Sequence, residues 1–396
     1  MKKLVLQPPA VIGIIGGGQL GKMMTVEAKR LGYRVVVLDP TPAAPAAQVA
    51  DKQIIGSFSD RAFLRQLAQE SDVLTYEFEH IQAAFLAELE AEGVRIYPSG
   101  KTLQKIQNKG EQKAMLLKAG LPVPSFRRVT GKEDVKNAAA VMGMPLVLKT
   151  CAGGYDGKGN YVIRHQGEIA QAMEAFAGAE VMVEQFIDFA CELSVIGARD
   201  LHDNMVFYPV AENIHESSIL RTTRVPAPLP AEIAEKAVEV ARKTLEFLDD
   251  YGVFCIEMFL TRQGEIYINE IAPRPHNSGH YTVEACSTSQ FEQLVRVVTG
   301  MPLGSSQLIC PAVMVNILGN DQVKGKYSFQ GTDKVLAEEG VYLHLYGKHE
   351  TQWLKKIGHI TALASSVEKG EEKACRALNH LVIIPEGEGD FYDGTK

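Results

Sequence analysis

The pattern of hydrophobic positions predicts a parallel sheet near the start of the chain. A short β-branched run at residues 11–15 is followed by a glycine-rich turn, and apolar residues then recur at helical spacing up to Leu31. A second apolar run, at residues 33–38, ends at Asp39. A strand, a glycine turn, a helix and a second strand form a βαβ unit, whose strands are parallel. Together with strands expected at 53–55, 73–76 and 95–97, this unit predicts one doubly wound, Rossmann-like domain over residues 1–100.

The hydrophobic pattern changes after residue 100. A helix is predicted near residues 101–119, and further helices near 168–177 and 231–248. Longer strands joined by short turns are predicted at 146–149, 160–164, 181–187, 192–199, 205–212, 253–260 and 265–272. Such connections indicate antiparallel sheets, so residues 101–305 are expected to form a domain of the α+β class. Short strands expected at 312–317, 341–346 and 359–364 predict a small β-rich C-terminal domain over residues 306–396.

Composition and charge narrow the possible partners. The chain is 46% hydrophobic and 22% charged, as is usual for globular proteins. Its formal net charge of −7 argues against a nucleic acid or a membrane surface as partner, because both favour a basic face. No apolar run reaches the roughly 18 residues that would suggest a membrane span. The six cysteines are widely scattered, which predicts unbridged thiols, a reducing compartment and therefore a cytoplasmic location.

The first glycine loop matches a dinucleotide-binding fingerprint. Gly16, Gly18 and Gly21 have the G-x-G-x-x-G spacing, and Asp39 follows eighteen residues after the last glycine. A nicotinamide-dependent oxidoreductase is therefore one hypothesis. The same strand, loop and helix could instead hold a substrate phosphate at the helix N-terminus, or only shape the site.

A second glycine loop lies beside a lysine. Lys149 ends a buried-looking strand, and residues 153–159 (GGYDGKG) contain four glycines in seven residues. So many glycines favour an irregular flap whose backbone N–H groups can point at phosphates. The spacing differs from the P-loop motif, because neither Ser nor Thr follows Lys158.

Two glutamates are expected to face each other on neighbouring strands. If Gln263 and Gly264 form a two-residue hairpin turn, Glu257 pairs with Glu270. The expected neighbours on that face are Cys255, Phe259, Ile268 and Ala272. Facing carboxylates in apolar surroundings need a shared proton or a cation, and Mg²⁺ is a common solution where ATP is consumed. Two solvated glutamates at a sheet edge are the alternative, and a bulge that shifted the register would remove the pairing.

These motifs together resemble a known family. Lys149, the flap, residues 184–187 and the two glutamates resemble the ATP-grasp fold. Residues 269–280 (NEIAPRPHNSGH), with 155–159, 18–21 and 77–79, resemble the N5-carboxyaminoimidazole ribonucleotide synthetases of purine synthesis, and the resemblance runs from about residue 11 to about 380. It implies a central ATP-grasp domain at 101–305 with a flap subdomain at about 122–183.

The resemblance also implies an activity. ATP, bicarbonate and 5-aminoimidazole ribonucleotide would give N5-carboxyaminoimidazole ribonucleotide, ADP and phosphate through carboxyphosphate, with Mg²⁺ as cofactor and a homodimer as assembly. Another ATP-grasp ligase is the nearest rival, and a non-catalytic nucleotide sensor is a further alternative.

The family resemblance implies roles for individual residues. Glu257 and Glu270 would hold Mg²⁺. Nucleotide contacts are implied for Lys109, Lys149, Gly154, Tyr155, Asp156, Gly157, Lys158, Gly159, Glu184, Gln185, Phe186, Ile187, Glu192, His215, Asn269 and Glu270. Substrate contacts are implied for Gln19, Leu20, Glu79, Tyr155, Asp156, Arg274, His276, Lys348 and Lys355, and catalytic roles for Tyr155, Asp156, Arg274 and His276. Gln352 and Lys355 stand where the family pattern has arginines, which weakens the expected grip on the substrate phosphate.

Overall fold

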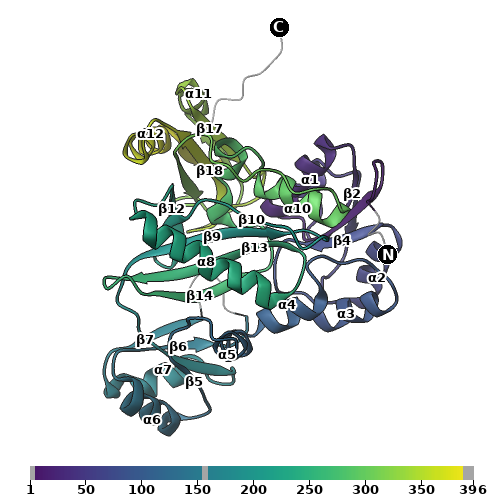
Figure 1. Cartoon of the computed structure of the whole chain (residues 1–396). Helices are drawn as coiled ribbons and strands as arrows, with labels where there is room; N and C mark the ends of the chain where they lie inside the picture. The colour runs from purple at the N-terminus through teal and green to yellow at the C-terminus, as the bar shows by residue number, and fades with distance from the viewer. Residues whose placement is uncertain (1–4, 154–158, 387–396) are drawn as a thin grey trace.

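The N-terminal part of the chain forms the expected parallel sheet. The computed structural model describes residues 5–153 and 159–386. Strands β1 (Val11–Ile15), β2 (Arg34–Asp39), β3 (Lys52–Ile55) and β4 (Val73–Tyr76) are parallel in the order β3-β2-β1-β4. Helices α1 (Gln19–Arg30), α2 (Arg61–Gln69) and α3 (Ala83–Ala91) connect or flank them (Figure 1). The strand expected at 95–97 is only a single bridge between Leu74 and Ile96.

The single helix expected near 101–119 is in fact two helices. Helix α4 (Gly100–Gln107) ends at Asn108, and α5 (Lys109–Lys118) begins directly after it. Asn108 has an extended backbone with φ −98° and ψ 111°, and its side-chain oxygen accepts a hydrogen bond from the Glu111 N–H. Asparagine is a preferred N-cap residue, so it both interrupts the first helix and starts the second. This interruption directs the N-terminus of α5 towards the site described below.

A small antiparallel sheet forms the lower lobe of Figure 1. Its strands are β5 (Phe126–Val129), β6 (Leu146–Thr150), β7 (Asn160–Ile163) and β8 (Val181–Gln185), in the order β5-β8-β6-β7. Helices α6 (Lys132–Met142) and α7 (Ile169–Ala175) supply apolar residues to the same core as these strands.

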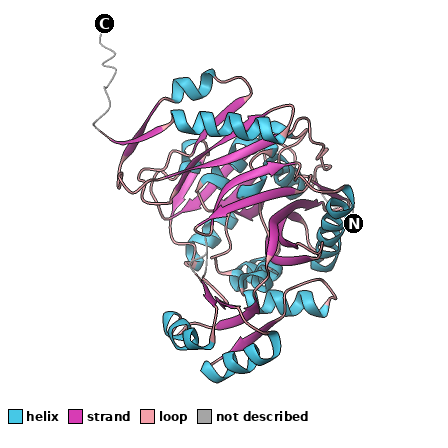
Figure 2. Cartoon of the chain, turned by 90° about the vertical axis from the view of Figure 1, so that its left-hand side faces the viewer, coloured by secondary structure: helices cyan, strands magenta, loops and turns pink. Residues whose placement is uncertain are grey.

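A nine-stranded sheet forms the centre of the molecule (Figure 2). Its order is β14-β13-β9-β11-β12-β15-β18-β17, with β10 paired to β9. The strands are β9 (Phe189–Arg199), β10 (Met205–Phe207), β11 (Ala211–Glu216), β12 (Ile219–Val225), β13 (Gly252–Thr261), β14 (Ile266–Ala272), β15 (Ala312–Leu318), β17 (Val341–Leu345) and β18 (Lys356–Leu363). The strand expected at 205–212 is thus divided between β10 and β11. The C-terminal strands extend the central sheet, because β15 pairs with β12.

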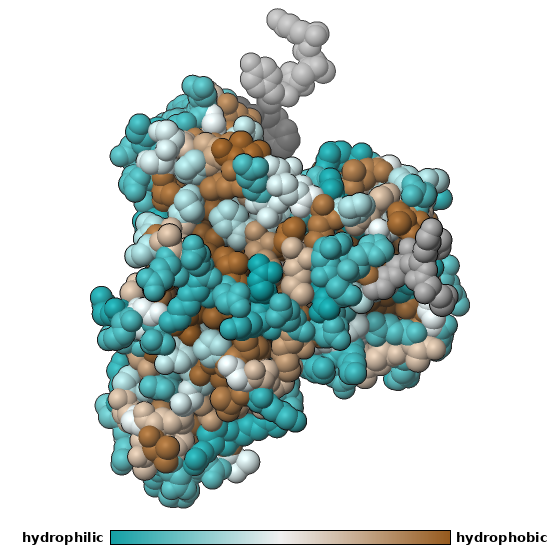
Figure 3. Space-filling view, viewed as in Figure 1, coloured by the Kyte–Doolittle hydropathy of each residue, from teal (hydrophilic) through white to brown (hydrophobic). Residues whose placement is uncertain are grey.

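The remaining elements lie outside these three sheets. They are α8 (Ala231–Leu248), α9 (Thr282–Ala285), α10 (Gln290–Thr299), α11 (Thr332–Ala337), α12 (Val367–His380), β16 (Tyr327–Gln330), β19 (Val382–Pro385) and the 3₁₀ turns η1 (Pro45–Gln48), η2 (Gln166–Glu168) and η3 (Asn277–Gly279). None of the described helices is long and apolar enough to cross a membrane. On the face drawn in Figure 3, hydrophilic residues are interspersed with smaller hydrophobic groups.

The two faces of the central sheet belong to different cores. Phe254 and Ile256 of β13 pack into the core that includes α8, whereas Val253 and Cys255 pack into the core that includes α10 and the N-terminal domain. Side chains alternate between the faces of a strand, so Glu257 shares the face of Cys255. The two glutamates therefore lie on the side of the sheet that faces the N-terminal domain.

Candidate active site

Glu257 and Glu270 face each other as expected, but the hairpin reaches this pairing by a different route. The turn has three residues, because the Thr261 N–H donates to the Glu265 carbonyl (2.8 Å) and the Thr261 carbonyl accepts from the Gly264 N–H (3.0 Å). Gly264 has φ +80°, the left-handed position of a three-residue hairpin. A bulge at Asn269 then adds one residue to β14 and restores the pair of Glu257 with Glu270.

The bulge corrects one of the expected neighbours. Ile268 pairs with Met258 and lies in the core below α8, on the other face from the glutamates, and Tyr267 pairs with Phe259 in its place. The expected two-residue turn at Gln263 and Gly264 was wrong. Because the wrong turn and the unforeseen bulge shift the register in opposite directions, the predicted pairing of Glu257 with Glu270 is nevertheless confirmed.

The two carboxylates have strongly different proton affinities. Burial and repulsion from Glu270 raise the pKa of Glu257 to about 7. The Lys109 ammonium, 2.6 Å from Glu270, lowers the pKa of Glu270 to about 2. Facing carboxylates that cannot both remain charged without compensation provide the donor set that a hard divalent cation prefers. The two residues therefore fit the expected metal pair.

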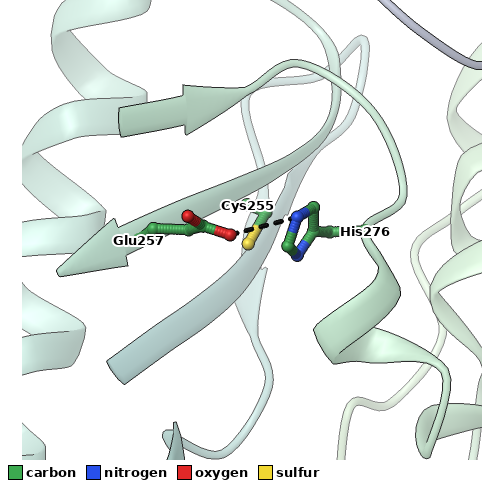
Figure 4. A group of neighbouring side chains, drawn as sticks. All are labelled: Cys255, Glu257 and His276. Atoms are coloured by element: carbon green, nitrogen blue, oxygen red, sulfur yellow. Dashed lines mark ion pairs between the residues drawn. The ribbon is translucent and has the colours of Figure 1, made fainter. Parts of the chain in front are cut away.

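His276, from the loop after β14, and Cys255, two residues before Glu257 on β13, lie close to Glu257. The ligand atoms of Cys255, Glu257 and His276 lie within 4.8 Å of one another (Figure 4). His276 Nε2 is 3.0 Å from Glu257 Oε1. The His276 backbone is fixed by Gln290, which accepts from its N–H (2.9 Å) and donates to its carbonyl (2.7 Å).

Side chains near the N-terminus of α5 hold β14, the strand that contains the bulge, through hydrogen bonds and an ion pair. Gln112 accepts a hydrogen bond from the Ile271 N–H at 3.1 Å, and Lys113 Nζ donates to the Ile268 carbonyl at 2.9 Å. Lys109, on the same helix, reaches the Glu270 carboxylate. One helix thus holds the backbone on both sides of Glu270 together with its side chain, which fixes the position of that carboxylate.

Glu184 lies between two lysines. Its oxygens are 2.6 Å from Lys113 Nζ and 2.5 Å from Lys149 Nζ. Burial alone would raise the pKa of Glu184, but the two ammonium groups outweigh it and lower that pKa. Lys149 also donates to Asn269 Oδ1 at 3.2 Å. The Glu184 side chain is therefore engaged with two lysines, and its expected contact with the nucleotide stays a prediction.

The other residues expected to contact the nucleotide lie on or next to strands β7, β8, β9 and β11 of the two antiparallel sheets. His215 and Glu192 form an ion pair on neighbouring strands of the central sheet. Glu192 raises the pKa of His215, against the effect of burial. Gln185 is the last residue of β8, and Phe186, which is 37% exposed, and Ile187 follow it. The Gly159 carbonyl accepts from the Thr150 N–H at 2.9 Å. Gly154, Tyr155, Asp156, Gly157 and Lys158 lie outside the described residues, so their expected roles remain predictions.

One cavity of about 1010 Å³ brings together expected residues from all three parts of the chain. Its lining includes Gln19, Leu20, Glu79, Lys109, Glu270, Arg274, His276, Lys348 and Lys355. Gln352, Trp353 and Lys356 also line it. Arg274 and Glu79 were expected separately and form one bidentate ion pair, with Nε to Oε1 at 2.9 Å and Nη2 to Oε2 at 3.2 Å.

The first glycine loop is occupied by the protein's own carboxylate. Glu77 accepts hydrogen bonds from the backbone N–H groups of Gly18 and Gly21, the latter at 2.7 Å. A Cβ atom on Gly16 would lie 2.3 Å from Glu77 Cγ. The anion-binding N–H groups at the start of α1 are therefore already used, which disfavours a dinucleotide pyrophosphate there. This loop shapes the site beside Gln19 and Leu20.

Sequence reasoning missed the residues that support the site. Lys113, Gln112, Gln290 and Glu77 are all buried and polar. The sequence spacing places Gln112 and Lys113 on the same face of a helix as Lys109. It does not indicate that their side chains hydrogen-bond to the backbone of β14.

Models of three protein families match the chain in series. They describe a ribonucleotide synthetase preATP-grasp domain at residues 10–107, an ATP-grasp domain at 114–291 and a phosphoribosylaminoimidazole carboxylase C-terminal domain at 312–373. With the facing glutamates and the lysines around them, this order defines an ATP-grasp enzyme.

Individual relatives narrow the class further. The N5-carboxyaminoimidazole ribonucleotide synthase of Bacillus subtilis is 45% identical over 362 residues, which cover 91% of this chain and 93% of that protein. The crystal structure of N5-carboxyaminoimidazole ribonucleotide synthetase from Thermotoga maritima matches with a TM-score of 0.87 at 45% identity, covering 95% of this chain and 100% of that one. The synthase from Aspergillus clavatus, in complex with ADP and 5-aminoimidazole ribonucleotide, matches with a TM-score of 0.87 at 34% identity, covering 94% and 98%. The chain belongs to the N5-carboxyaminoimidazole ribonucleotide synthase family.

Proposed function

We propose that this chain carboxylates 5-aminoimidazole ribonucleotide with bicarbonate at the expense of ATP, giving N5-carboxyaminoimidazole ribonucleotide, ADP and phosphate. Family membership and the activity named for its relatives support the proposal. The observation that carries it is the shared cavity, which joins Glu270 and Lys109 to the substrate-side lysines Lys348 and Lys355. This is a step of de novo purine biosynthesis.

The chemistry requires a good leaving group on bicarbonate. A bicarbonate oxygen attacks the γ-phosphorus of ATP, the bond to ADP breaks, and carboxyphosphate forms. The amine nitrogen of the ribonucleotide then attacks its carboxyl carbon, or the CO₂ it releases, while phosphate leaves and the amine gives up a proton. Positioning and neutralisation of charge account for most of the catalysis in such phosphoryl transfers. Arg274 supplies a guanidinium to this cavity, held in place by Glu79.

The facing glutamates fit a magnesium ion. Glu257 and Glu270 offer carboxylate oxygens from neighbouring strands, and the pKa of Glu257, raised by burial and by Glu270, supports a need for compensating positive charge. Mg²⁺ bound there would neutralise phosphate oxygens of ATP. Lys109 and Lys149, which now lie against Glu270 and Glu184, are the proposed phosphate-binding lysines.

The remaining assignments follow from position. Glu184 is proposed to hold Lys113 and Lys149 in place, so that adenine would meet backbone and apolar groups of residues 185–187. Glu192 and His215 are proposed to contact the nucleotide sugar and its surroundings. Gln19, Leu20, His276 and Lys355 are proposed for the substrate side, since all four line the cavity.

Phosphate release tests the function directly. Purified protein with Mg²⁺ and ATP should release phosphate at full rate only when bicarbonate and 5-aminoimidazole ribonucleotide are both present. Equal release without the ribonucleotide would contradict the proposal, and release with a different acceptor would identify another ATP-grasp ligase. A fluorescence titration with NADH is the companion measurement, and tight binding would revive the oxidoreductase hypothesis.

We also propose that the protein acts as a homodimer in the cytoplasm. All six cysteines are unbridged, which fits a reducing compartment. Light scattering on the purified protein measures the assembly, and a monomeric mass at working concentration would contradict the dimer.

A further inference from the structure

A line of buried polar side chains runs from the site into the central sheet. Ser278, Ser194, Asn213 and Thr223 are at most 5% exposed. They come from the loop after β14 and from β9, β11 and β12. Ser194 lies directly beside Glu257 in the pairing of β9 with β13. Polar groups so deeply buried must satisfy one another, so each hydrogen bond constrains the next.

The direction of every bond in this line is fixed from the His276 end. The Ser278 backbone N–H can only donate, and it lies 3.3 Å from His276 Nδ1, which must therefore carry a lone pair. The Ser278 hydroxyl, 2.9 Å from the same nitrogen, consequently donates to it as well. Because its proton is used there, Ser278 Oγ accepts from the Ser194 hydroxyl at 2.9 Å.

The same logic determines the far end. Ser194 Oγ has given its proton to Ser278, so it accepts from Asn213 Nδ2 at 2.9 Å. Asn213 Oδ1 then faces Thr223 and accepts from its hydroxyl at 3.0 Å. The four side chains form a directed chain of donors that ends on His276 Nδ1.

The chain has a consequence for the metal carboxylate. With a lone pair on Nδ1, neutral His276 carries its proton on Nε2, which lies 3.0 Å from Glu257 Oε1. The imidazole therefore donates to Glu257 and orients it. Cys255, Glu257 and His276 lie close enough together to suggest a site for a soft metal ion (Figure 4). Because His276 Nε2 carries a proton, it has no lone pair for such an ion.

We propose that Ser278 and Ser194 are positioning residues that fix His276 as its Nε2–H tautomer and thereby hold the Glu257 carboxylate opposite Glu270. Asn213 and Thr223 complete the chain by supplying the donor that Ser194 requires. The inference rests on the proposed function only for its catalytic consequence. Outer residues that orient metal ligands typically affect activity or metal affinity by about 10- to 100-fold.

The tautomer is measurable without substrates. The full-length protein, labelled with ¹⁵N at its 10 histidines, should show for His276 the two-bond ¹H–¹⁵N pattern of an Nε2–H imidazole. The His276→Gln variant assigns the signal by its loss. An Nδ1–H or doubly protonated His276 in the wild type would overturn the proposal, whatever the activity of the enzyme.

Alanine variants test the positioning role. Ser278→Ala and Ser194→Ala should shift the averaged His276 nitrogen signals towards the other tautomer and lower kcat by about 10- to 100-fold, with a smaller effect on KM for 5-aminoimidazole ribonucleotide. Ser289→Ala is the matched control, because Ser289 is an equally buried serine that caps α10 and lies outside the chain. It should leave both the tautomer and kcat unchanged.

The outcomes separate this inference from the proposed function. Ser278→Ala and Ser194→Ala proteins with unchanged His276 signals and unchanged kcat would refute the positioning role. An Nε2–H signal that shifts in both variants, in a protein that does not carboxylate the ribonucleotide, would support the chain and refute the function.

Discussion

Replacing Glu184 with glutamine should destabilise the protein by about 3–5 kcal/mol, because removing one partner of a buried ion pair leaves charge uncompensated. The side chains of Glu184 and Lys113 are each 2% exposed, and that of Lys149 is 10% exposed. The three groups together carry one net positive charge, and the variant leaves two positive charges facing each other. Burial already lowers the pKa of Lys113 to about 8, which shows how poorly this position tolerates charge.

A double variant shows whether the three groups act as a unit. In Lys113→Met/Glu184→Gln only Lys149 stays charged, and its ammonium keeps the Asn269 amide oxygen at 3.2 Å. Groups in contact typically couple by about 0.5–3 kcal/mol, so the double variant should lose less stability than the sum of the single variants. Urea unfolding followed by circular dichroism on all four proteins measures this difference.

An exposed ion pair of similar length provides the control. Arg61 and Glu88 are 2.7 Å apart, with side chains 57% and 49% exposed. Glu88→Gln should change stability by only about 0–1 kcal/mol. The reasoning would be refuted if Glu184→Gln cost no more than Glu88→Gln, or if the effects of the two buried substitutions were additive.

Three further predictions concern the site and its surroundings. Glu270→Gln should abolish phosphate release while preserving the circular dichroism spectrum. Glu265→Gln, an exposed change on the same hairpin, should retain activity. Activity in Glu270→Gln would contradict the assignment of Glu270 as a metal ligand. Burial holds the pKa of His280 and His359 well below the usual value, so the folded protein resists protonation that the unfolded chain accepts. Stability should therefore be full above about pH 6.5 and fall below it, by up to roughly 1.4 kcal/mol per histidine and pH unit, and equal urea midpoints at acidic and neutral pH would count against this. Trp353, the only tryptophan, is 58% exposed and lines the cavity, so 5-aminoimidazole ribonucleotide should change the protein's tryptophan emission, and saturating turnover with constant emission would contradict its place there.

The hairpin shows what a sequence can and cannot specify. Alternation of apolar residues and the nearby glycine located both strands to within one or two residues. Backbone hydrogen bonds, and the hydrogen bond from Lys113 to the Ile268 carbonyl, accompany the three-residue turn and the bulge at Asn269. No local sequence pattern indicates these hydrogen bonds. The pairing of Glu257 with Glu270 was predicted from an assumed two-residue turn, and it is present because the longer turn and the bulge shift the register in opposite directions.

Supporting residues escaped prediction for a related reason. Gln112 and Gln290 stabilise the site through backbone groups of Ile271 and His276. A side chain that hydrogen-bonds to a backbone places no demand on the residue type of its partner, so it leaves no paired signature in a single sequence. Lys109 and Arg274 are proposed to contact ligands through charge; the chemistry of their side chains points to that role, and both line the cavity.

The first glycine loop illustrates why a motif needs its tertiary surroundings. G-x-G-x-x-G describes a turn whose N–H groups can bind an anion, but it does not say which anion. Here Glu77, whose carboxylate binds Gly18 and Gly21, is the anion. A glutamate at the end of a neighbouring parallel strand reaches the same helix N-terminus that a pyrophosphate would use, because strand ends of a parallel sheet converge on one edge. The choice between cofactor site and structural cap therefore depends on β4, far along the chain, and the same carboxylate that fills the loop brings Gln19 and Leu20 to the wall of the cavity.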